Sequence, residues 1–207
     1  MKSMLKDAAI LFVITLFAGL ILGAVYQVTK EPIALAEEKA AKEAYAEVFP
    51  AASDFSLITE RMPEDAKWQS AWTESGFEMV EVENVLEALD QNETLLGYVL
   101  TVTSHEGYGG DITFTMGICT DGTLNGISIL SISETAGLGM KAEEVLKPQF
   151  ANKNFPSFTY TKSGATSDNQ IDAISGATIT TNAVTTAVNG GLYYFQTQLG
   201  GSSYEAK

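Results

Sequence analysis

The stretch that decides the fold spans residues 111–132 and reads DITFTMGIC-TDGT-LNGISILSI. Two runs rich in β-branched residues, 111–119 and 124–132, flank the dipeptide Asp121-Gly122. Aspartate and glycine tolerate the backbone angles of a tight turn, so this pattern predicts an antiparallel hairpin. The run at 95–103, LLGYVLTVT, has the same character and predicts a further strand of that sheet.

Three helices are expected around the sheet, over residues 33–48, 141–150 and 180–199. The first helix is expected to start at Pro32, because proline is tolerated in a first helical turn. In the last helix, Gly190-Gly191 lowers the helix propensity of the middle. Residues 50–75 show no clear period, and residues 80–89 fit either a strand or a helix. The expected fold class is α+β, an antiparallel sheet flanked by helices.

An apolar run precedes this domain. Residues 8–26 read AAILFVITLFAGLILGAVY, 19 residues without a charge, which as a helix would span about 30 Å, the thickness of a bilayer core. A cleaved signal peptide is the alternative, but its apolar region is usually shorter and ends in small residues, whereas Tyr26-Gln27-Val28 follow here. We therefore expect one transmembrane anchor helix over residues 8–28.

The flanking charges predict the orientation. Lys2 and Lys6 precede the run, which favours a cytoplasmic tail at residues 1–7 and a domain on the outer side of the plasma membrane. The rest of the chain is expected to form a helical and mixed part, a domain core and a flexible tail, at residues 29–94, 95–199 and 200–207.

Composition excludes several classes of protein. The chain has 207 residues with a net charge of −14, and the part beyond the apolar run carries 10 basic and 25 acidic residues. Such a surface repels phosphate backbones, so we expect no nucleic-acid partner. One cysteine and one histidine, His105, exclude a cysteine-built cluster, a multi-histidine metal site and a bis-histidine haem. If the protein handles electrons, an organic cofactor must carry them.

The tetrapeptide Ser-Gly-Ala-Thr occurs twice, at residues 163–166 and 175–178. The second copy runs directly into the predicted helix at 180–199. A small-residue turn that opens a helix presents unpaired backbone amides, and these favour a phosphate. The alternative is that Ser175, Thr180 or Thr181 merely caps the helix. The residues alone leave both readings open, as they do the role of the first tetrapeptide.

The segment Asp172-x-x-Ser175-Gly-Ala-Thr178-x-Thr180 resembles the flavinylation motif of the FMN-binding domain family. Two further segments resemble elements of that family in the same order: Gly107-Tyr108-Gly109-Gly110, and residues 134–139, Glu-Thr-Ala-Gly-Leu-Gly. The family's second element is Glu-Thr-Pro-Gly-Leu-Gly, so Ala136 replaces a proline here.

The resemblance implies that Thr178 carries FMN through a phosphoester, attached by a separate flavin transferase that Asp172 helps to recognise. It implies no catalytic residue and no metal site in this chain. The cofactor would lie against residues of the two motifs: Ser175, Gly176, Ala177 and Thr180, together with Glu134, Thr135, Gly137, Leu138 and Gly139. Whether His105 lies near the flavin is left open.

Within the family, the chain is most similar to the G subunits of Rnf-type complexes, with the C subunits of Na⁺-pumping NADH:quinone reductases as the alternative. The resemblance implies an electron-transfer subunit of a membrane ferredoxin:NAD⁺ oxidoreductase that transports Na⁺ or H⁺, with other membrane subunits as partners. A membrane-tethered FMN relay for an extracellular reductase is a further alternative, and so is an anchored binding module without redox chemistry.

Overall fold

The computed structural model describes residues 2–59 and 62–200. The described residues form two compact units, one up to residue 41 and one from residue 42 onward. Apart from Gly200, the tail predicted at 200–207 lies outside the described residues. The elements in chain order are α1 Lys2–Val48, β1 Asp54–Thr59, α2 Ala66–Glu74, β2 Val80–Leu89, β3 Leu95–Ser104, β4 Ile112–Cys119, β5 Leu124–Ile132, η1 Gly139–Lys141, α3 Ala142–Val145, η2 Lys147–Phe150, β6 Thr159–Thr161, β7 Gln170–Asp172 and α4 Thr178–Gln198.

Helix α1 is continuous through Pro32, so the helix start predicted at that residue is wrong. A single proline removes one backbone hydrogen-bond donor and crowds one carbonyl, and α1 remains helical on both sides of Pro32 despite this destabilisation. Among the described residues, α1 is the one helix long and apolar enough to span a membrane, with a mean hydropathy of 2.7 in its most apolar window. None of that window is buried inside the protein. The anchor boundaries at residues 8 and 28 stay a prediction.

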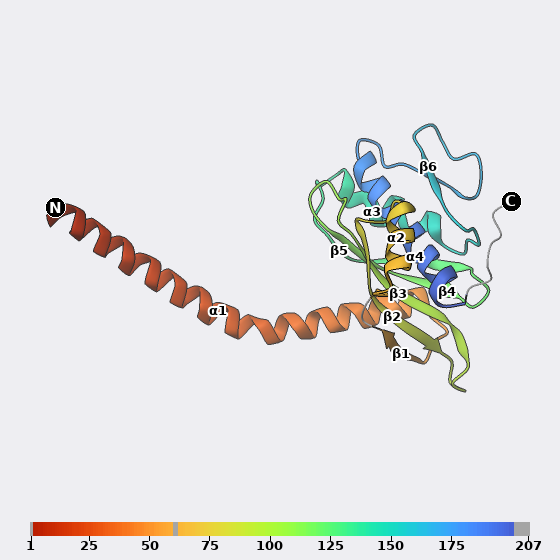
Figure 1. Ribbon diagram of the computed structural model, residues 1–207, viewed down its shortest axis with the longest axis horizontal. Helices are drawn as coiled ribbons and strands as arrows, with labels where there is room; N and C mark the ends of the chain where they lie inside the picture. The colour runs from red at the N-terminus through yellow and green to blue at the C-terminus, as the bar shows by residue number, and fades with distance from the viewer. Residues whose placement is uncertain (1, 60–61, 201–207) are drawn as a thin grey trace. The chain divides into compact units, whose positions relative to one another are not determined.

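An antiparallel sheet of five strands, in the order β1-β2-β3-β4-β5, forms the centre of the second unit (Figure 1). The predicted hairpin is confirmed as β4 and β5, and Gly122 in its turn has a φ of 86°. The undecided segment at 80–89 is strand β2. It pairs along its length with β3, so residues 29–94 and 95–199 contribute to the same sheet.

Residues 50–75 are more regular than expected. They contain the edge strand β1, which pairs only with β2, and the short helix α2. Asp65 caps α2, because its side chain accepts a hydrogen bond of 2.9 Å from the Trp68 amide. Neither element has a strong sequence period, since one is a short edge strand and the other a nine-residue helix that buries two tryptophans.

The two faces of the sheet carry two hydrophobic clusters. Helix α4 packs on one face, where an added Cβ at Gly191 would lie 2.1 Å from Met116 Sδ. At the predicted weak point, Gly190-Gly191, the missing side chains therefore let the helix lie directly against the sheet. On the other face, Val48 and Phe49 at the end of α1 pack against Val99. The helix predicted at 141–150 is divided into η1, α3 and η2.

Candidate functional site

A pocket of about 540 Å³ lies where three loops from distant parts of the sequence meet. Its volume falls within the range of about 300–1,000 Å³ that is common for small-molecule and cofactor sites. The lining residues are Tyr108, Glu134, Thr135, Leu138, Gly139, Gly176, Ala177, Thr178, Ile179 and Thr180. The pocket thus joins all three segments that the sequence singled out.

The first wall is the start of α4. Thr178 is the first residue of the helix, two positions earlier than predicted, and Gly176 before it has a φ of 79°, which disfavours other residues. The first backbone bond of the helix runs from the Thr181 amide to the Ala177 carbonyl. The amides at residues 178–180 precede that bond, so they are the free donors that helix N-termini present to anions.

Thr181 holds this wall in shape. Its hydroxyl is buried, accepts a hydrogen bond of 3.1 Å from the Ile174 amide and donates one of 3.0 Å to the Ala177 carbonyl. Ala177 is the residue before the helix and has no side chain that could cap it. Thr181 bonds to the turn before the helix, and no side chain of the described residues caps α4, so the capping alternative is not realised.

The second wall is the loop at residues 134–139. The Thr135 carbonyl accepts hydrogen bonds from the Leu138 and Met140 amides at 3.1 and 3.3 Å, which closes the turn without the family's proline. Gly139 is buried, and a Cβ there would lie 2.6 Å from Thr180 Oγ1 and 2.8 Å from Glu134 Oε2. Only glycine permits this close approach of the loop to α4.

The third wall is the loop between β3 and β4. The Tyr108 amide donates a hydrogen bond of 2.8 Å to Glu134 Oε1, which links this loop to the second wall. A Cβ at Gly109 would lie 2.0 Å from the Ser133 carbonyl oxygen, so the loop backbone rests directly on the residue that follows β5. Tyr108 and Ile179 line the pocket although neither was predicted. An aromatic residue inside a glycine loop was the available signal for Tyr108.

The lining of the pocket suits a ligand that is apolar at one end and anionic at the other. The Tyr108, Leu138 and Ile179 side chains are 72%, 39% and 52% exposed, so apolar surface gathers around the free amides of α4. The Thr178 hydroxyl has no hydrogen-bond partner in the described part of the chain. These properties match an isoalloxazine ring and a phosphate, the two ends of FMN.

Not every predicted residue lines the pocket. Ser175 and Gly137 lie beside it, and the Asp172 side chain turns to the first tetrapeptide, where it accepts a hydrogen bond of 2.6 Å from the Ala165 amide. Thr166 is likewise engaged, because its amide and hydroxyl both bond to the Gln170 side chain at 2.9 and 3.1 Å. The two tetrapeptides therefore differ: one hydroxyl is bonded in a loop and the other faces a pocket.

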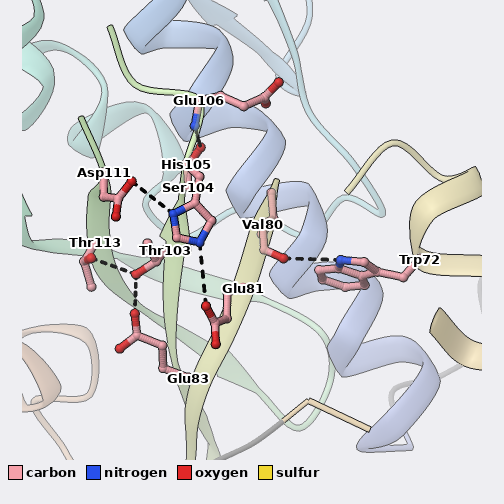
Figure 2. Close-up of polar contacts among 10 residues, drawn as sticks. All are labelled: Trp72, Val80, Glu81, Glu83, Thr103, Ser104, His105, Glu106, Asp111 and Thr113. Atoms are coloured by element: carbon pink, nitrogen blue, oxygen red, sulfur yellow. Dashed lines mark hydrogen bonds and ion pairs between the residues drawn. The ribbon is translucent and has the colours of Figure 1, made fainter. Parts of the chain in front are cut away.

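His105 lies outside the pocket, at the base of the loop that carries Tyr108. Figure 2 shows its ring between two carboxylates, with Nδ1 3.0 Å from Asp111 Oδ1 and Nε2 3.6 Å from Glu81 Oε2. The hydrogen bond with Asp111 is the main cause that raises the pKa of His105 above 6.5. Burial opposes that shift, and Glu81 reinforces it.

The chain is similar to known proteins along most of its length. Residues 107–192 match the family of FMN-binding domains, and residues 1–48 match the family described as the RnfG N-terminal region. The G subunit of the Na⁺-translocating ferredoxin:NAD⁺ oxidoreductase complex of Acetobacterium woodii is 33% identical over 94% of this chain and 93% of that protein. The chain belongs to the G-subunit family of ion-translocating oxidoreductase complexes.

A second member of the G-subunit family, from the ion-translocating oxidoreductase complex of Methanosarcina acetivorans, is 29% identical over 96% of this chain and 98% of that protein. Among solved structures, NqrC of Shewanella oneidensis is similar with a TM-score of 0.46 and 21% identity, over 56% of this chain and 58% of that one. The FMN-binding match begins at Gly107 and ends within α4, so it contains all three walls of the pocket.

Proposed function

We propose that this chain is the FMN-carrying electron-transfer subunit of an Rnf-type membrane complex. By this proposal the complex passes electrons from reduced ferredoxin to NAD⁺ and couples their flow to the transport of Na⁺ or H⁺. Membership of the G-subunit family supports the complex, and the name of the Acetobacterium relative supports the reaction. The observation that carries the proposal is the position of Thr178, at the first turn of α4 inside the pocket that three family segments build.

FMN is the cofactor that these residues would hold. The free amides of residues 178–180 and the positive end of the helix dipole would face the phosphate, whose remaining negative charge is favoured there. Leu138, Ile179 and Tyr108 would contact the ring, with Glu134 and Thr135 near its polar edge. Bound FMN would supply electron transfer, and donors beside its ring would tune its potential.

Thr178 is the proposed attachment site because its hydroxyl is unpaired in the described structure and lines the pocket. In the attachment, Thr178 Oγ1 would bond to the phosphorus of the FMN half of FAD while the bond between the two phosphates breaks. AMP would leave, and the hydroxyl would lose its proton. We assign this step to a separate flavin transferase. Asp172, the exposed last residue of β7, would contribute to recognition by that enzyme.

Helix α1 is proposed to anchor the chain in the plasma membrane and to meet other subunits of the complex. The charges at Lys2 and Lys6 favour a cytoplasmic N-terminus, which would place the FMN domain on the outer side. A covalent bond suits that location, because a flavin lost outside the cell is not replaced.

The test is to produce the chain together with a flavin transferase, denature it, and separate it on a gel under ultraviolet light. Fluorescence should remain with the wild-type band, be absent from Thr178→Ala and remain in the matched variant Thr166→Ala. Intact mass should show one added flavin phosphate on the wild type. Fluorescence that follows Thr166 instead of Thr178, or a wild-type mass without the addition, would overturn the assignment.

Purification from the native membrane separates the functional alternatives. An Rnf-type subunit should co-purify with several multi-span membrane proteins and should reduce no acceptor when isolated from them. A free-standing tethered reductase would instead purify alone and retain turnover with an external acceptor. A fusion reporter at the C-terminus that is active only in the cytoplasm would reverse the proposed orientation.

A further inference from the structure

We propose that His105 is a positioning residue that clamps the loop between β3 and β4 over the flavin pocket, and that loss of its proton releases the loop. The importance of this clamp for the flavin rests on the proposed function, whereas the clamp itself is a property of the chain. Three observations lead to it: the contacts at the base of the loop, the contact at its tip, and the exposure of the Tyr108 ring.

Contacts between the His105 ring and two carboxylates hold the base of the loop together. His105 directly follows β3, and its ring lies between Glu81 of β2 and Asp111, the residue before β4 (Figure 2). The His105 amide also donates a hydrogen bond of 2.9 Å to the Met79 carbonyl, so the backbone at this point is already fixed. A protonated imidazole can bond to both carboxylates at once, whereas a neutral ring has one donor and faces the other carboxylate with a lone pair.

The tip of the loop reaches the pocket. Tyr108 is three residues from His105, and its amide bonds to Glu134, which lines the pocket with Thr178. A Cβ at Gly107 would lie 2.0 Å from the Gly110 carbonyl oxygen within the loop, and one at Gly109 would lie 2.0 Å from the Ser133 carbonyl oxygen outside it, so the glycines keep the loop compact and close to its support. The Tyr108 side chain is 72% exposed, so its place at the pocket depends on the loop backbone and not on packing of its own ring.

The environment of His105 allows it to titrate. The ring is 36% exposed and lines a groove of about 390 Å³ together with Glu78, Glu81 and uncharged side chains of α2. The charged groups around it are therefore acidic: Glu78 before β2, Glu81 in β2, Asp111 before β4, and Glu106 next in the chain. Asp111 and Glu81 favour the protonated ring, whereas burial opposes it.

The direction of the pH effect follows from this. The pKa of His105 is raised in the folded chain, mainly by the hydrogen bond with Asp111. The clamp is therefore fully formed below the unfolded pKa of about 6.5, and it is lost as the pH rises through the higher folded value. Above that range Tyr108 should leave the pocket more often, and a bound flavin should become more accessible to solvent.

Hydrogen–deuterium exchange of the full chain in detergent micelles tests the clamp without a flavin, in the Thr178→Ala background. The readout is protection of the loop at residues 105–111, relative to the intrinsic exchange rate, at about pH 6 and about pH 8.5. Protection should fall about fivefold or more with rising pH in the parent, because the titrating contact at the base of the loop weakens and leaves the bond with Glu134 at its tip. Lys153→Gln is the matched control, since it removes a different partly exposed cation, which pairs with Asp168.

Two substitutions separate a positioning role from a structural one. His105→Gln, which has no charge, should show low protection at both pH values, and His105→Lys, which keeps the charge, should show high protection at both. Equal protection at both pH values in the parent, or a failure of lysine to restore it, would overturn the proposal. In flavin-loaded wild type, quenching of flavin emission by neutral acrylamide should increase about twofold over the same range. If protection changes but quenching does not, the claim that the loop covers the flavin is refuted.

Discussion

Replacing Gly139 by alanine should separate the loop at residues 134–139 from the first turn of α4. The added methyl would lie 2.6 Å from Thr180 Oγ1, 2.7 Å from Glu134 Cβ and 2.8 Å from Glu134 Oε2. These gaps fall 0.6–0.8 Å short of the 3.4 Å at which ordinary contact begins. The loop must therefore move away from the helix by most of an ångström, and within the loop Glu134 must move away from residue 139.

Overpacking of this kind costs about 1–3 kcal/mol, while the lower entropy of the unfolded chain returns about 0.4–1 kcal/mol. Overpacking outweighs the entropy gain, so the free energy of unfolding should fall by about 1–2 kcal/mol and Tm by about 2–8 °C. Because the shift also disturbs the Glu134 contact with the Tyr108 amide, flavin content per polypeptide should fall after co-production with the transferase.

Gly76→Ala is the matched control for this substitution. Gly76 has a φ of 80° and no atom within 4 Å of an added Cβ, so alanine there costs only left-handed backbone strain of about 1–2 kcal/mol. Gly76 lies at the end of α2, outside the pocket. The Gly76→Ala variant should therefore be less stable than the wild type but have the same flavin content. Wild-type Tm and flavin content in Gly139→Ala would refute the close approach of loop and helix.

Further predictions concern the turn before α4 and the end of α1. Thr181→Val should destabilise the domain by about 1–3 kcal/mol and reduce flavinylation, because the buried Ile174 amide loses its acceptor. Thr185→Val, which removes only a bond to a helical carbonyl, should leave the level of flavinylation unchanged. Burial tends to raise the pKa of Glu47, but hydrogen bonds from Lys147 and Ser128 lower it overall, below 4.5. Ionised Glu47 should therefore stabilise the domain above about pH 4.5, and this contribution should be lost as the pH falls through the lower folded pKa. Chemical denaturation over this pH range measures the loss. The Glu47→Gln variant should not show it.

Much of the fold could be predicted because its signals are local. The hairpin around Asp121-Gly122 depends on two residues that permit a tight turn and on runs that flank it directly. Helix α4 could be predicted because its own apolar residues recur at helical spacing. Strand β1 and the continuity of α1 through Pro32 could not be predicted. The strand is stabilised by pairing with β2, and the helix continues through a residue whose local preference is to interrupt it.

By itself, the sequence determined the chemistry available to this protein: a long apolar segment, an acidic domain, too few cysteines and histidines for a cysteine-built cluster or a multi-histidine metal site, and a threonine motif at a helix start. Tertiary structure alone decided that Tyr108 joins Glu134 and Thr178 in one pocket, and that His105 closes the loop above it. The reason is physical. These residues lie up to 73 positions apart, and only the register of β2 to β5 and the close packing of α4 on that sheet bring them together.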